Sequence, residues 1–152
     1  MITLASLMIR PGLILAGLLT PGSPDSARTI DISAYDSLHF SVREIDAHPG
    51  ERLHVVFHNQ GSLPKTVMGH NWVLLRSGID SMSYASHAQS AKSEGYEPAS
   101  LSDQVLAVVP LVGGGESSDI TFTAPTQPGS YAFLCSSPGH CAAGMRGELV
   151  VK

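Results

Sequence analysis

A short run of metal-binding side chains just before the last predicted strand constrains this chain most. Cys135, His140 and Met145 follow one another at C-x4-H-x4-M spacing. Residues 131–135 and 147–152, on either side of this run, have the composition of β-strands. A loop tied to strands at both ends can hold three side chains in place before a metal arrives. Since thiolate and thioether select reduced copper and imidazole suits both oxidation states, the spacing predicts a copper site.

A fourth ligand has to come from another part of the chain. The segment Met68-Gly-His-Asn-Trp72 offers His70, far upstream of Cys135. Two histidines and one cysteine with a weak axial methionine are typical of electron-transfer copper sites, because this set serves both oxidation states. None of these side chains has to act as an acid or a base. The combination therefore indicates electron transfer rather than catalysis.

The composition predicts one all-β domain. The 152 residues are 43% hydrophobic and only 14% charged, which is enough apolar content for one core. Fifteen glycines and ten prolines separate short segments rich in β-formers, and this favours a Greek-key β-sandwich of about eight strands. Residues 78–100 break the pattern and are expected to form a short helical insertion. The net charge of −4, without a basic run, argues against nucleic acid as a partner.

The N-terminal segment differs from the rest of the chain. The apolar run at 13–19 is too short for an ordinary membrane span and leads into a turn-rich stretch. We interpret residues 1–28 as a signal peptide or an N-terminal anchor with a linker, and residues 29–152 as the domain. The protein is therefore expected to be periplasmic or otherwise exported, either free or associated with a membrane through 1–28.

Three other interpretations of the same side chains remain open. Cys135 and Cys141 are the only cysteines, and an exported protein could join them in a disulfide. Zinc would accept a cysteine and two histidines, although methionine is a poor zinc ligand. Cys135 and His140 could mimic a nucleophile pair, but no orienting or oxyanion group accompanies them. Without a disulfide, Cys141 would be either a small loop residue or a thiol open to oxidation.

Two stretches of the chain resemble the azurin and auracyanin branch of the cupredoxins, the small blue copper proteins. Phe57-His-Asn-Gln-Gly-Ser-Leu-Pro-Lys-Thr-Val-Met-Gly-His-Asn-Trp-Val-Leu74 is similar to the first-ligand region of that family, and Leu-Cys-Ser-Ser-Pro-Gly-His140 to its second. The Leu-Pro-Lys-x-Val-Met-Gly-His-Asn-Trp part is highly specific. The likeness covers roughly residues 30–152 and implies the cupredoxin fold.

The resemblance also implies a ligand set for one type 1 copper ion. His70 and His140 would bind through ring nitrogens, Cys135 through its thiolate, and Met145 as the axial ligand. The carbonyl of Gly69 would lie near the opposite axial position.

Groups around the ligands follow from the same resemblance. Asn71 would tie the two ligand segments together, and the backbone N–H of Ser137 would donate to the cysteine sulfur. An apolar docking patch would surround the histidine that reaches the surface, made of Leu63, Val67, Met68, Pro138, Gly139, Ala142 and Ala143.

The function implied is the transfer of single electrons between redox partner proteins through a Cu(II)/Cu(I) couple. A cytochrome or another respiratory donor or acceptor is the expected kind of partner. The resemblance implies no enzymatic activity, no small-molecule substrate and a monomeric protein. Copper storage, delivery or sensing is the alternative, but delivery proteins more often use exposed methionine and histidine runs, which this chain lacks.

The chain departs from the azurin pattern at several positions. Four residues separate His140 from Met145, as in auracyanin, whereas azurin has three at this place. The disulfide near the N-terminus of azurin has no counterpart. A histidine that azurin carries before its Leu-Pro corresponds to Asn59, while the adjacent His58 should point to the other face of its strand. Ser137 replaces a bulky residue and should make the patch less hydrophobic.

Overall fold

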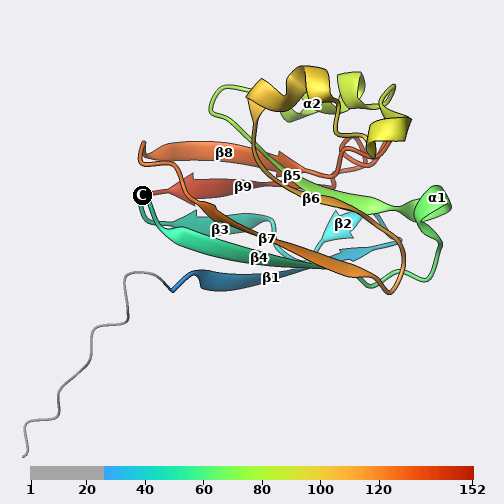
Figure 1. Cartoon of the computed structure of the whole chain (residues 1–152), viewed down its shortest axis with the longest axis horizontal. Coiled ribbons are helices and arrows are strands. Elements are labelled where there is room, and N and C mark those ends of the chain that lie inside the picture. The colour runs from blue at the N-terminus through green and yellow to red at the C-terminus, as the bar shows by residue number, and fades with distance from the viewer. Residues whose placement is uncertain (1–25) are drawn as a thin grey trace, which may run out of the picture.

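The computed structural model describes residues 26–152, which fold into two β-sheets packed face to face (Figure 1). The first sheet has the order β2 (His39–Phe40), β1 (Arg28–Tyr35), β4 (Arg52–Asn59) and β7 (Ser117–Thr123). The second has the order β3 (Glu44–Ala47), β9 (Arg146–Val151), β8 (Gly129–Leu134), β5 (His70–Leu75) and β6 (Val105–Val112). The predicted all-β sandwich is confirmed.

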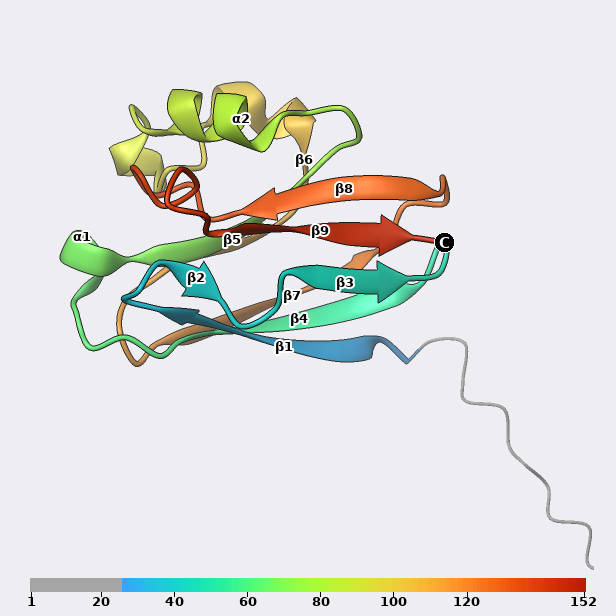
Figure 2. The ribbon, with the colours of Figure 1, turned by 180° about the vertical axis from the view of Figure 1, so that it is seen from behind.

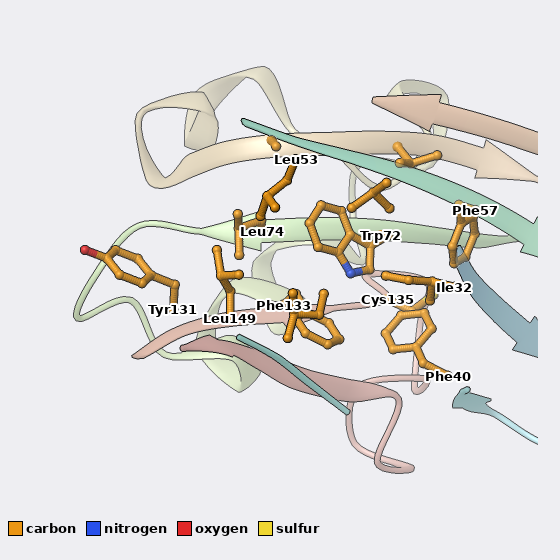
Figure 3. Packing of buried hydrophobic residues seen from close by; sticks show 14 of the residues in the cluster. Ile32, Phe40, Leu53, Phe57, Trp72, Leu74, Tyr131, Phe133, Cys135 and Leu149 are labelled. Atoms are coloured by element: carbon orange, nitrogen blue, oxygen red, sulfur yellow. The ribbon is translucent and has the colours of Figure 1, made fainter. Parts of the chain in front are cut away.

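The core lies between the two sheets and follows from the alternation of the strands. Along β4 every second side chain is buried, which places Leu53, Val55 and Phe57 inward. Phe133 on β8 and Trp72 on β5 meet them from the other sheet, with their ring centroids 5.6 Å apart (Figure 3). Full burial of such aromatic side chains contributes about 2–3 kcal/mol each.

The expected helical insertion covers the outer face of the second sheet. It comprises α2 (Ser81–Ala88) and the 3₁₀ turns η1 (Lys92–Glu94) and η2 (Ala99–Gln104), so it extends a little beyond the predicted 78–100. Asp80 begins α2 by accepting a hydrogen bond from the Ser83 N–H at 2.7 Å. Because β5 lies between the core and this insertion, all six of its residues are buried.

One end of the sandwich gathers the predicted ligand segments. The short helix α1 (Lys65–Met68), the start of β5 and the loop between β8 and β9 lie at this end, and the C-terminus lies at the other (Figures 1 and 2). Among residues 26–152, no helix is long and apolar enough to span a membrane. The predicted leader falls almost wholly on residues 1–25, outside the described part of the chain, and stays a prediction.

Candidate metal centre

Alternation along two neighbouring strands brings His70 and Cys135 to the same side of the second sheet. Strand β5 pairs antiparallel with β8, and Cys135 directly follows the last residue of β8. Trp72 and Cys135 belong to the core between the sheets, whereas Val73 and Leu134 face the helical insertion. His70 has the parity of Trp72 and therefore lies on the core side, next to Cys135.

Three ligand atoms converge at this point. The Cys135 Sγ lies 3.4 Å from the His140 Nδ1 and 3.9 Å from the His70 Nδ1, and the two Nδ1 atoms are 3.2 Å apart. Donors bound about 2.0–2.3 Å from one ion in a trigonal plane lie roughly 3.5 Å from one another. The spacing therefore fits a single metal ion. Only these three residues form such a group of His, Cys, Asp or Glu within the described residues.

The loop that carries His140 is closed on itself. The Cys135 N–H donates to the Met145 carbonyl at 3.0 Å, and the Met145 N–H donates to the His140 carbonyl at 3.0 Å. Gly139 and Gly144 have φ values of +83° and +102°, which side chains with a Cβ rarely adopt, and these two bends return the chain to β9. Met145 is fully buried and packs in the same core cluster as Cys135.

Hydrogen bonds lock the two ligand segments together on the other side of the sheet. The Asn71 Oδ1 accepts from the Ser136 N–H at 2.8 Å, and the Asn71 Nδ2 donates to the Ser136 Oγ at 2.8 Å. The Ser137 hydroxyl donates to the Gly69 carbonyl at 2.8 Å. Ser136 was not among the predicted site residues, although its place after Cys135 puts it on the same face as Asn71.

Burial shapes the titration of the three ligands. It lowers the pKa of His70 to about 4, with the nearby His140 ring acting in the same direction, and it lowers the pKa of His140. Both imidazoles therefore keep a free lone pair at neutral pH. Burial raises the pKa of the Cys135 thiol, and hydrogen bonds from the backbone N–H groups of Asn71 and Ser137 partly oppose this. A bound metal ion would deprotonate the thiol outright.

Acid should destabilise the metal-free protein through His70. In the unfolded chain His70 is protonated below about pH 6.5, whereas in the folded protein it stays neutral down to about pH 4. Between these two pH values, protonation of His70 therefore favours the unfolded state. Relative to His70→Gln, the wild-type free energy of unfolding should fall by up to about 3 kcal/mol as the pH drops through this window. Urea denaturation of both metal-free proteins at several pH values measures it. A difference that stays constant with pH would contradict the assignment.

The surface around the loop matches the predicted patch only in part. His140 is 8% exposed, so just its edge reaches the surface. The residues of the predicted apolar patch are exposed, except for Met68, which is half-buried. We call these residues the apolar rim: Leu63, Val67, Met68, Pro138, Gly139, Ala142 and Ala143.

Two other predictions concern residues beside the site. Cys135 and Cys141 are free thiols, so the alternative of a disulfide is not realised in the structure. Cys141 is buried under α2, where its Sγ lies 3.6 Å from the Met82 Sδ, and the interpretation as a small loop residue holds. Asn59 is buried, while His58 lies on the outer face of β4 and contacts Ser117, as the strand alternation predicted.

Known proteins resemble the chain over most of its length. A family model described as copper binding proteins of the plastocyanin/azurin family matches residues 27–152. The azurin of Pseudomonas chlororaphis is 34% identical over 126 residues, which cover 81% of this chain and 97% of the azurin. Auracyanin-B of Chloroflexus aurantiacus is 32% identical over 127 residues, which cover 82% of this chain but only 52%, about half, of auracyanin-B.

Solved structures agree with these relatives. Auracyanin A of Chloroflexus aurantiacus, described as a "blue" copper protein, has a TM-score of 0.73 at 32% identity, covering 84% of this chain and 100% of that one. The azurin iso-2 of Methylomonas sp. strain J has a TM-score of 0.71 at 30% identity, covering 84% and 99%. Together with the ligand group, these likenesses settle the metal as copper. The chain belongs to the plastocyanin/azurin family of copper-binding proteins.

Proposed function

We propose that this protein is an electron carrier that holds one type 1 copper ion with His70, Cys135, His140 and Met145. The Gly69 carbonyl would be the weak ligand opposite the methionine. The bound ion supplies a one-electron Cu(II)/Cu(I) couple. The observation that carries the proposal is the convergence of two imidazoles and a thiol at one buried point.

Rigidity around the ligands supports electron transfer. The paired hydrogen bonds between Asn71 and Ser136 hold the start of β5 against the end of β8. The backbone bonds of Met145 keep the ligand loop closed. A site that cannot rearrange presents the same ligands to both oxidation states, so little energy is lost in reorganisation when an electron arrives. Backbone donation from Asn71 and Ser137 to the cysteine sulfur would further tune the potential.

The apolar rim is the proposed surface for electron exchange. In the proposed arrangement, which follows the family resemblance, it would surround the edge of His140, the proposed ligand whose ring reaches the surface. Val67 is 65% exposed and Leu63 is 37% exposed, so both offer apolar contact area to a partner. These short side chains lose less conformational entropy on binding than long charged side chains would. A small interface of this kind suits brief encounters. A cytochrome or another respiratory redox protein is the proposed partner.

The setting of the protein follows from the same proposal. Residues 29–152 would act as one exported, monomeric domain, periplasmic or held at a membrane through residues 1–28. The proposed role involves no chemistry on a substrate, and the protein would therefore not be an enzyme.

A copper-loaded sample tests the proposal directly. We expect an intense visible thiolate-to-copper band and rapid electron exchange between oxidised and reduced protein, measured by NMR line broadening. Ala142→Glu places a charge in the apolar rim and should slow this exchange roughly tenfold or more, because two like charges would face each other. Thr121→Glu, on the exposed face of β7, is the matched control and should not. A protein without the band, or one that yields its copper to a chelator without measurable exchange, would favour delivery or storage instead.

A further inference from the structure

The helical insertion brings a carboxyl group to the back of the metal centre. Glu97 lies between η1 and η2, and its Oε1 is 3.4 Å from the Asn71 Nδ2. The same amide group donates to the Ser136 Oγ at 2.8 Å and lies 3.4 Å from the Gly95 carbonyl. Three acceptors therefore compete for two N–H groups, and the charge on Glu97 decides how strongly it attracts one of them.

Asn71 joins this carboxyl group to the ligands. It follows His70 in the chain, its side-chain oxygen accepts from the Ser136 N–H, and its backbone N–H donates to the Cys135 sulfur. Glu97 is thus separated from the thiolate by a single residue, which is itself fully buried. In such buried surroundings, electrostatic interactions are weakly screened and hydrogen bonds are stronger than in water.

The surroundings of Glu97 leave its carboxyl group poised between two states. Burial raises the pKa of Glu97 to about 7, and the hydrogen bond from Asn71 opposes this. On one side, Tyr84 of α2 has a pKa raised to about 12 by burial and by Glu97, so it stays neutral.

On the other side lies a cavity of about 390 Å³ that Glu97 lines together with Lys65, Lys92 and Glu94. Lys65 contacts Glu116 at 3.5 Å, and the Glu94 carboxylate accepts from the Ala99 N–H at 2.7 Å. None of the three charged groups contributes to the shift in the pKa of Glu97.

We propose that Glu97 is a proton-linked positioning residue that couples the reduction potential of the copper centre to pH through Asn71. The inference rests on the proposed electron-carrier function. At pH values between the Glu97 pKa of the oxidised protein and that of the reduced protein, the entry of one electron is accompanied by the addition of about one proton from solvent to the Glu97 carboxylate, so the two added charges balance there. A nearby carboxylate stabilises the oxidised centre more than the reduced one. The potential should therefore fall as the pH rises through the titration of Glu97, and reduction should in turn raise the pKa of Glu97.

Two measurements test this coupling. In the first, the carboxyl carbons of 13C-glutamate-labelled protein are followed against pH by NMR, metal-free and with Cu(I). The metal-free Glu97 signal should titrate near 7 rather than at the ordinary value of 4.5, and at a different pH with Cu(I). In the second, the potential of the copper-loaded protein is followed from about pH 5 to 8. Each tenfold difference in proton affinity between the oxidised and reduced protein should add about 59 mV to the total change.

Matched variants separate Glu97 from its neighbours. Glu97→Gln should remove the pH dependence of the potential in this interval and leave the visible band in place. Glu94→Gln removes the same charge from the same segment, without the contact to Asn71, and should keep the pH dependence. A Glu97 that titrates near 4.5, or a blue protein with a potential independent of pH, would overturn this inference alone. A protein without the visible band would overturn the electron-carrier proposal as well.

Discussion

Cys135→Ser is expected to abolish the visible band and to weaken copper binding by more than about 100-fold. Loss of a residue that only hydrogen-bonds to a metal ligand typically weakens metal binding by about 10- to 100-fold, and loss of a ligand itself should cost more. A serine hydroxyl stays protonated near neutral pH, so the soft anionic ligand would be replaced by a hard neutral one. The band is a thiolate-to-copper transition and cannot form without the thiolate. Absorption spectra and copper content after dialysis against a chelator measure both effects.

Cys141→Ala is the control for this substitution. Cys141 is the other thiol of the chain and is also buried, but its sulfur faces the Ser81 carbonyl and Met82 under α2. The variant should keep the band and its full copper content, with a modest loss of stability of about 1 kcal/mol from lost packing. A band that survives in Cys135→Ser, or one that disappears in Cys141→Ala, would contradict the ligand assignment.

The sequence predicts the ligand loop between β8 and β9 well, because the positions of its residues depend on contacts that are short-range in the chain. Cys135, His140 and Met145 all lie on or next to one loop, and the Pro138-Gly139 pair favours a turn at its start. Trp72, two residues after His70, is fully buried between the two sheets. Fold class and copper as the metal are confirmed, whereas the individual roles of the ligands and their neighbours stay predictions.

The pairing of the strands and the residues packed around the ligands depend on contacts between segments far apart in the chain. Parallel pairing of β1 with β4 and of β3 with β9 joins strands that are not neighbours in the sequence, and no local sequence pattern indicates it. In the same way, Glu97 belongs to an insertion whose apolar face is weak, so nothing in its own segment indicates that it docks against Asn71. The contact of Ser136 with Asn71 could have been predicted from the sequence, because Ser136 directly follows Cys135 at the end of β8 and must therefore face away from the core.

Among the polar residues around the proposed ligands, Asn71 should lose the most stability when it is replaced by alanine. The side chain is fully buried and forms two hydrogen bonds of 2.8 Å with Ser136. Its removal leaves the buried Ser136 N–H without its acceptor, and each buried polar group left unpaired costs about 1–3 kcal/mol. The free energy of unfolding of the metal-free protein should therefore fall by about 2–4 kcal/mol, measured by urea denaturation.

Ser136→Ala is the matched control, because it removes the hydroxyl but keeps the backbone N–H that donates to Asn71. The hydroxyl accepts from the Asn71 Nδ2 and donates to the Tyr96 carbonyl at 2.6 Å, so a loss of about 1–2 kcal/mol is expected. The double variant should lose less than the sum of the two, since both changes act on one hydrogen-bonded pair. If Asn71→Ala proved no more harmful than Ser136→Ala, the pair could not be what holds β5 against the end of β8. With the pair removed, the copper-loaded protein should also show a broadened visible band, because His70 and Cys135 would then move independently of each other.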